Sequence, residues 1–236
     1  MNKMIELKAA DGHVLSAYEV APSGKPRGGI AIIQEIFGVN PHIRAVADGY
    51  AADGYHVIAP GLFDRHERGY ERGYTADDID AGIKIAKSMN PMHMLHDLEA
   101  TIKKLGAYGK VGIVGYCLGG SLAFMAAANL SGLAATVGYY GGMIAANLDK
   151  KPKVPVMLHF GDQDQSIPMA DIDKIKAALD PKTVQMFVYP GAGHAFNREG
   201  TQSHHAPSAK LARERTLEFL RRNSRVRSRA SLALGA

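Results

Sequence analysis

The sequence predicts a single α/β domain with a mostly parallel central sheet and helices on both of its faces. Short β-branched, apolar runs alternate along the chain with helix-like segments, as expected for strands joined by crossover helices. Nearly all of the runs are continuously apolar, which is typical of strands covered on both faces. A chain of 236 residues that is 46% hydrophobic is long enough for one such core, and no repeat or Gly/Ser-rich linker divides it.

The periodicity predicts seven strands and six helices. We expect the strands at residues 15–20, 29–34, 56–59, 111–114, 134–139, 154–160 and 184–189. We expect the helices at residues 42–52, 78–88, 95–105, 118–129, 169–179 and 207–222, with Pro168 opening the fifth. The domain then spans residues 1–222, without a large lid domain. Residues 223–236 form a basic tail that we expect to be disordered.

Composition argues against nucleic-acid and membrane partners. The net charge is +5, but much of the excess comes from a C-terminal cluster without interleaved aromatic residues, formed by Arg221, Arg222, Arg225, Arg227 and Arg229. No apolar stretch approaches the roughly 20 residues that span a bilayer. The single cysteine cannot form an internal disulfide, and the N-terminus has no apolar signal core. We therefore expect a cytoplasmic protein.

The single cysteine lies in a glycine-rich junction between a predicted strand and a predicted helix. Residues 114–120 read Val-Gly-Tyr-Cys-Leu-Gly-Gly, so Cys117 occupies the nucleophile position of the G-x-nucleophile-x-G elbow that is typical of α/β-hydrolases. Glycines are needed there because the strained turn leaves no room for side chains between strand and helix. A small buried hydrophobic residue is the alternative interpretation of Cys117, but it gives the glycines no purpose.

Two later segments supply an acid and a base after successive predicted strands. Residues 159–168 contain Asp162 and Asp164, and either carboxylate is suited to orient an imidazole or to cap a turn. Residues 189–196 form a glycine-rich loop that carries His194. Nucleophile, acid and histidine thus follow the chain order of the α/β-hydrolases. We therefore interpret His194 as the general base and not as an ordinary solvated loop residue.

The loop at residues 34–40, Gln-Glu-Ile-Phe-Gly-Val-Asn, follows the strand before the first main helix. In this fold that loop donates one oxyanion-hole N–H, and the residue after the nucleophile donates the other. The predicted donors are the backbone N–H groups of Ile36 and Leu118. Glu35 is a carboxylate at a predicted buried strand end, where it is costly unless it is paired. A salt bridge to a surface arginine is the structural alternative to a catalytic role.

Four motifs together resemble the dienelactone hydrolase (carboxymethylenebutenolidase) family. They are the segments at residues 34–40, 115–120 (Gly-Tyr-Cys-Leu-Gly-Gly), 138–141 (Gly-Tyr-Tyr-Gly) and 191–196 (Gly-Ala-Gly-His-Ala-Phe). The resemblance runs from about residue 5 to about residue 220. It implies a triad of Cys117, Asp164 and His194, with Asp162 standing where the family commonly has a glycine.

The resemblance also gives Glu35 a role. In the family the corresponding glutamate pairs with the cysteine of the resting enzyme and helps it become a thiolate when substrate enters. Here this implies a contact between Glu35 and Cys117 that a charged substrate would displace. The thiol would thereby be protected between turnovers.

Substrate-binding residues follow less directly from the resemblance. Arg198 matches an arginine that holds a substrate carboxylate in the family, and a surface arginine is the alternative. Tyr139 matches a pocket tyrosine, with a core position as the alternative. A second family arginine belongs between the third strand and the elbow strand, where Arg65, Arg68 and Arg72 are all candidates, and we select Arg72 as a possible substrate contact.

These residues predict an enzyme that hydrolyses a small ester or lactone, dienelactone-like, through a Cys-His-Asp triad and an acyl-enzyme. The alternatives are a hydrolase of another small ester or thioester, or, in a different class, a noncatalytic binding protein or thiol redox sensor with the same fold. We expect no cofactor, and no metal because His93, His96, His204 and His205 lack cysteine or carboxylate partners at ligand spacing. We expect a substrate with a carboxylate, and a monomer or weak homodimer.

Overall fold

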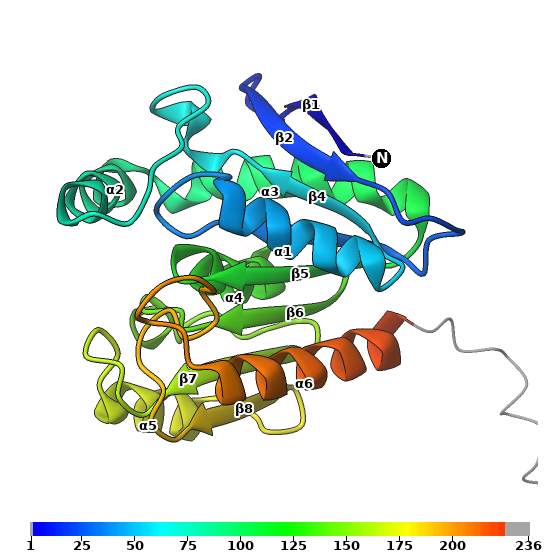
Figure 1. Ribbon diagram of the computed structural model, residues 1–236. Helices are drawn as coiled ribbons and strands as arrows, with labels where there is room; N and C mark the ends of the chain where they lie inside the picture. Colours follow the sequence, from blue (N-terminus) through cyan, green and yellow to red (C-terminus); the bar gives the residue numbers. More distant parts are fainter. Residues whose placement is uncertain (1, 225–236) are drawn as a thin grey trace, which may run out of the picture.

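An eight-stranded, mostly parallel sheet organises the molecule (Figure 1). The structure, a computed structural model, describes residues 2–224. The strand order is β1-β2-β4-β3-β5-β6-β7-β8. The first two neighbouring pairs, β1 with β2 and β2 with β4, are antiparallel, and every later pair is parallel. The strands are β1 (Asn2–Lys8), β2 (Val14–Val20), β3 (Gly29–Ile33), β4 (His56–Pro60), β5 (Val111–Tyr116), β6 (Leu133–Tyr139), β7 (Val156–Gly161) and β8 (Val184–Tyr189).

Helices cover both faces of the sheet, as predicted. In Figure 1, α1 and α6 lie in front of the strands, and α3 and α4 lie behind them. The helices are α1 (Pro41–Ala52), α2 (Ala76–Ser88), α3 (Pro91–Leu105), α4 (Leu118–Asn129), α5 (Met169–Ala178) and α6 (Ala206–Ser224). Three short 3-10 helices are η1 (Leu62–Arg65), η2 (Gly106–Tyr108) and η3 (Ile144–Ala146). No helix within residues 2–224 has the length and apolarity that a bilayer crossing requires.

The central strands are buried along their whole length because helices shield both sides. Every residue of β3, β4, β5 and β7 is buried. Continuous apolar runs are therefore the sequence pattern of these strands, and alternation is not needed. Parallel strands bring their carboxyl ends to one edge of the sheet, where open α/β folds bind their ligands. In Figure 1 this edge faces α2.

The main departure from the predicted elements is at the N-terminus. Residues 2–8 form β1, an edge strand that pairs only with β2 and is mostly exposed, so it lacks the apolar run that identified the other strands. Helices α2 and α3 begin earlier than predicted because Thr75 and Asn90 cap them with their side chains. Helix α6 continues to Ser224, two residues into the predicted tail. The rest of that tail lies outside the described residues.

Candidate active site

Cys117 occupies a sharp turn between β5 and α4. Its backbone has φ 54° and ψ −112°, in the region that favours glycine and that side chains rarely adopt. The turn lifts the thiol to the carboxyl edge of the sheet and places it at the N-terminus of α4. The positive end of a helix dipole stabilises an anion such as a thiolate at this position.

The glycines around Cys117 let strand and helix approach each other closely. A Cβ atom on Gly115 would overlap the carbonyl oxygen of Gly119, and one on Gly119 would overlap that of Ile33. A Cβ atom on Gly120 would overlap the carbonyl oxygen of Tyr139. Each overlap is with backbone, which cannot move aside as a flexible side chain can. The glycines predicted to shape the elbow are therefore required by packing.

His194 connects the thiol to a buried carboxylate. Its Nε2 lies 3.2 Å from Cys117 Sγ, and its Nδ1 lies 2.8 Å from Asp164 Oδ2. The other oxygen of Asp164 accepts hydrogen bonds from the N–H groups of Ser166 and Ile167, at 2.8 and 3.2 Å. The carboxylate is thus held from both sides. The structure brings the three residues of the predicted triad together in the order nucleophile, histidine, acid.

Asp162, the other candidate acid, binds the backbone of the loop that carries His194 and not the imidazole. Its Oδ1 accepts hydrogen bonds from Gly191 N–H at 2.8 Å and from the Gln163 side chain at 3.1 Å. Gly191 has φ 75° and opens the loop that carries His194. Asp162 therefore fixes the start of this loop, and Asp164 contacts the imidazole.

The partners of His194 change its protonation. Burial alone would lower the pKa of this histidine, but the hydrogen bonds to Asp164 and Cys117 and their charges outweigh it and raise the pKa to about 10. Imidazolium is therefore the favoured form of His194 at neutral pH. The ring is thus positioned to exchange a proton with the sulfur, which lies 3.2 Å away.

The predicted oxyanion donors line the same cavity as the thiol. Ile36 and Leu118 both contribute to its wall. Within residues 2–224 neither of their backbone N–H groups has an acceptor, whereas the next N–H of the elbow, that of Gly119, donates to Gln34 O at 3.1 Å. Two free N–H donors beside the nucleophile can hold the oxygen of a tetrahedral intermediate.

Glu35 pairs with Arg198 and not with the thiol. Arg198 donates two hydrogen bonds of 2.9 Å to the two oxygens of Glu35, and the two residues are 8% and 1% exposed. The guanidinium also stacks on the rings of Phe37 and Tyr74, at 5.0 and 4.5 Å from their centroids. The expected contact between Glu35 and Cys117 is absent from this arrangement of the described residues. The structural alternative for Glu35, an ion pair with an arginine, is what the structure shows, although this arginine is buried.

Tyr139 is a core residue, so its expected place in the substrate pocket is wrong. It is fully buried at the end of β6, and its hydroxyl lies 2.8 Å from Thr216 Oγ1 on α6. The next residue, Tyr140, turns toward the site. It has φ 39°, and its ring centroid lies 5.1 Å from that of His194.

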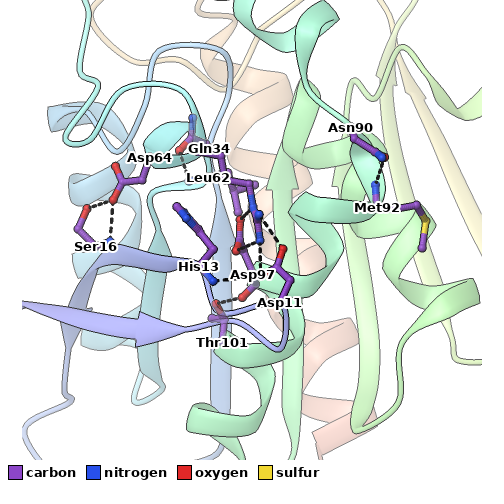
Figure 2. Close-up of polar contacts among 11 residues, drawn as sticks. Asp11, His13, Ser16, Gln34, Leu62, Asp64, Asn90, Met92, Asp97 and Thr101 are labelled. Carbon is purple, nitrogen blue, oxygen red and sulfur yellow. Dashed lines mark hydrogen bonds and ion pairs between the residues drawn. The ribbon is translucent and has the colours of Figure 1, made fainter.

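Arg65 anchors the segment between β4 and α2 and does not reach the cavity. Its guanidinium donates to both oxygens of buried Asp97 on α3, at 2.7 and 2.8 Å, and pairs with Asp11 at 2.8 Å. Figure 2 shows Asp97 and Asp11 side by side, with a second set of contacts from Asp64 to Ser16. Burial raises the pKa of Asp97, which makes the compensating charge of Arg65 important.

The other two arginines of this segment lie on the surface. Arg68 pairs with Glu6 on β1. Arg72 contacts Glu67 at 3.3 Å and covers the ring of Tyr70. Neither is among the described residues that line the cavity, although the backbone N–H of Arg72 donates to Phe37 O at 3.0 Å, and the expected substrate contact of Arg72 stays a prediction. Sequence alone could not separate these arginines because their partners come from distant segments.

The cavity above the thiol has a volume of about 410 Å³ and a mostly apolar wall. Sequence reasoning missed much of this wall, including Phe37 and three residues of α2, Ile79, Ile83 and Ala86. The signal was present, since these helical residues are spaced four and three apart and share one face. Within residues 2–224, no cluster of three or more His, Cys, Asp or Glu side chains could hold a metal ion.

Known proteins resemble this chain along most of its length. Residues 15–224 match the model of the dienelactone hydrolase family. A carboxymethylenebutenolidase of Pseudomonas putida is 35% identical over 92% of this chain and 94% of its own length. A Synechocystis protein provisionally given the same name is 38% identical over 76% of this chain and 80% of its own length.

Solved structures show the same fold. A Klebsiella pneumoniae protein provisionally described as a dienelactone hydrolase superposes with a TM-score of 0.80 at 28% identity, covering 93% of this chain and 98% of its own. An esterase of Pyrococcus furiosus superposes with a TM-score of 0.68 at 16% identity, covering 94% of this chain and 92% of its own, which supports the fold alone. The chain is therefore an α/β-hydrolase and belongs to the dienelactone hydrolase family.

Proposed function

We propose that this protein hydrolyses small carboxylic esters or lactones through an acyl-enzyme on Cys117. The observation that carries the proposal is the position of His194, which contacts Cys117 Sγ through one ring nitrogen and Asp164 through the other. A nucleophile, a base and a group that orients the base are the elements of covalent acyl transfer. The backbone N–H groups of Ile36 and Leu118 are the oxyanion donors in this proposal.

The first half of the reaction forms a thioester. The Cys117 thiolate attacks the carbonyl carbon, a C–S bond forms, and the carbonyl oxygen becomes an oxyanion between Ile36 and Leu118. The intermediate then collapses, and the bond from carbon to the alcohol oxygen breaks. His194, as imidazolium, gives its proton to the departing oxygen. In a lactone this oxygen stays attached to the acyl group.

The second half releases the acid. Neutral His194 takes a proton from water, whose oxygen attacks the thioester carbon. The C–S bond breaks and restores the thiolate beside an imidazolium. Asp164 holds the imidazole in the orientation that points Nε2 at the sulfur. No redox step and no co-reactant other than water is needed.

The names of relatives make carboxymethylenebutenolide, a lactone with a carboxylate, one substrate to assay. An activating role for Glu35 would require this side chain to leave Arg198 and approach Cys117, and it stays a prediction. Arg198 is the arginine among the described cavity-lining residues and is therefore our candidate for contact with a substrate carboxylate. It lines the cavity, and its Nε and Nη2 already contact Glu35.

Mass spectrometry on the intact protein tests the acyl-enzyme. With p-nitrophenyl acetate we expect release of nitrophenolate and an acetyl adduct on Cys117, the single cysteine of the chain. Cys117→Ala should lose the adduct and reduce turnover at least a thousandfold. Folded, reduced wild-type protein with neither adduct nor turnover would contradict the proposal. That result would favour a binding protein or a thiol redox sensor.

A further inference from the structure

A buried hydrogen-bond network joins helix α6 to the last three strands of the sheet. Thr216 on α6 is its centre, because its Oγ1 lies 2.8 Å from Tyr139 Oη on β6 and 3.0 Å from His159 Nε2 on β7. The other ring nitrogen of His159 lies 2.8 Å from Tyr189 Oη on β8. All four residues are at most 3% exposed, and none of them lines the active-site cavity.

The imidazole of this network is neutral. Burial, together with the charge of Arg215, lowers the pKa of His159 to about 3. A neutral imidazole donates through one nitrogen and accepts through the other, so one line of donation can run between Tyr139 and Tyr189 and satisfy all three contacts. A buried polar network that is fully satisfied holds its members in one arrangement.

The strand residues of the network also hold the nucleophile and the surroundings of the base through their backbone carbonyls. Tyr139 O accepts a hydrogen bond from Cys117 N–H at 3.0 Å. His159 O accepts one from Tyr140 N–H at 2.8 Å, and the ring centroid of Tyr140 lies 5.1 Å from that of His194. The side chains that bond to Thr216 thus belong to residues whose main chain contacts the elbow and the residue beside the base.

The third strand of the network leads to the other two triad residues. Tyr189 is the last residue of β8, and its carbonyl oxygen accepts a hydrogen bond from Asp162 N–H at 3.2 Å. The loop that carries His194 follows Tyr189, and Asp164 follows Asp162 by two residues. Hydrogen bonds of the sheet fix neighbouring strands to one another, and the network adds a common fixed point on α6.

We propose that Thr216 and His159 are positioning residues, which hold the carboxyl ends of β6, β7 and β8 in the arrangement that brings Cys117 and His194 together. The inference rests on the proposed hydrolase function and adds a requirement for it outside the cavity. A displacement of about 1 Å between reacting groups can slow a reaction by about a hundredfold. The network therefore affects the chemical step more than it affects substrate binding.

The variant Thr216→Val tests this role, because it removes the hydroxyl and keeps a β-branched side chain. With protein in excess over p-nitrophenyl acetate, stopped-flow release of nitrophenolate gives the acylation rate constant and the dissociation constant of the ester. We expect the rate constant to fall about tenfold or more, while the dissociation constant stays within about twofold of the wild type. Thr216→Ser keeps the hydroxyl and should restore the rate constant to within about threefold.

Thr101→Val is the matched control. Thr101 is as buried as Thr216, and its Oγ1 donates a hydrogen bond of 2.8 Å to Asp97 O within α3, outside the network. This variant should leave both constants within about twofold of the wild type. Circular dichroism and thermal unfolding verify that each variant is folded.

A double-mutant cycle identifies the shared hydrogen bond. Tyr139→Phe alone should slow acylation about threefold or more, which tests the network even if Thr216→Val does not fold. The double variant Thr216→Val/Tyr139→Phe should be no more than about twofold slower than Thr216→Val, because both substitutions remove the same bond.

Four outcomes would overturn the inference. A wild-type acylation rate in Thr216→Val or in Tyr139→Phe, or a loss that Thr216→Ser does not restore, would remove the positioning role. An equal loss in Thr101→Val would reduce the effect to general core stability. Additive losses in the double variant would contradict a shared network. Absence of ester hydrolysis by the wild type would instead contradict the proposed function, so the two failures are distinguishable.

Discussion

Asp162 and Asp164 lie two positions apart, yet only Asp164 contacts the imidazole of His194. Replacing Asp164 by Asn should lower kcat/KM for p-nitrophenyl acetate about a thousandfold or more, because an amide no longer fixes the tautomer that the base needs. The matched change Asp162→Asn should cost less than about tenfold, since it alters the loop and not the proton relay. Steady-state kinetics on both variants show which substitution lowers kcat/KM more. A larger loss in Asp162→Asn would assign the acid to Asp162.

The pKa of His194 offers a second prediction at this scale. It should titrate near 10 in the wild type, as followed by the chemical shift of its ring protons, and should fall by at least one pH unit in Asp164→Asn, which loses the charge that raises it. The folded-state pKa lies above the ordinary value of 6.5, so protonated His194 stabilises the fold. That contribution is complete below about pH 6.5 and is lost as the pH rises through about 10.

Urea unfolding at two pH values tests whether the protonated form of His194 stabilises the fold. His194→Gln should reduce the free energy of unfolding more at pH 6 than at pH 10.5, because the wild-type advantage comes from the proton bound to the imidazole. An equal reduction at both pH values would mean that His194 is not protonated at neutral pH. The wild-type protein, unfolded under the same conditions at both pH values, serves as the control.

The site was predictable where a short motif fixes geometry. The glycines on both sides of Cys117 predict the nucleophile elbow. The glycine-rich loop that carries His194 comes directly after β8. The partner of Glu35 was not predictable, because Arg198 lies 163 positions later in the chain. Tyr139 failed for a different reason: it ends β6 with its ring in the core, and the positive φ of Tyr140, just after the strand, brings that ring beside His194 instead.

At the scale of elements, α2 is in direct contact with the oxyanion loop. A Cβ atom on Gly82 would overlap the carbonyl oxygen of Ile36, so the helix backbone lies against a residue that lines the cavity and is a proposed oxyanion donor. Gly82→Ala should therefore push α2 outward or displace Ile36. We expect kcat for p-nitrophenyl acetate to fall about tenfold, although alanine is the better helix former.

Thermal unfolding and a substitution at the neighbouring Ala81 separate a displacement of Ile36 from a change in helix stability. Ala81→Gly, at an exposed position of the same helix, removes helix propensity without touching Ile36 and should lower the melting temperature while leaving kcat nearly unchanged. Unaltered kinetics in Gly82→Ala would show that Ile36 does not depend on this contact.

Most elements were predictable because buried strands and capped helices carry local signals. The core strands β3 to β7 appear as apolar runs, and α1, α4 and α6 follow their expected ranges closely. Strand β1 was missed because an exposed edge strand keeps its charges and is stabilised by pairing with β2, which the sequence of β1 alone does not reveal.

At the scale of the molecule, the segment before α2 is tied to the body through Arg65 and Asp97. Arg65→Ala should lower the free energy of unfolding by about 3 kcal/mol at pH 7, because it leaves Asp97 buried without its cation. The deficit should shrink toward pH 4, since burial already raises the pKa of Asp97 and a protonated carboxyl needs no cation. Urea unfolding at both pH values measures this.

Kinetics on the Arg65→Ala variant test whether this arginine belongs to the substrate site. Arg65 does not line the cavity, so kcat/KM of the folded variant for p-nitrophenyl acetate should stay within about twofold of the wild type. Arg68→Ala is the matched control, because it breaks an exposed pair with Glu6 and should cost less than about 1 kcal/mol. A selective loss of activity in Arg65→Ala would return this arginine to the substrate site.

The contact of Gly82 with Ile36 also bears on how this enzyme could diversify. Positions 79, 83 and 86 face the cavity from a helix of 13 residues, and none of them belongs to the proton relay. A library that varies these three codons and keeps codon 82 as glycine would search new substrate shapes while the elbow and the oxyanion donors stay in place. The same library with codon 82 randomised should yield far fewer active clones.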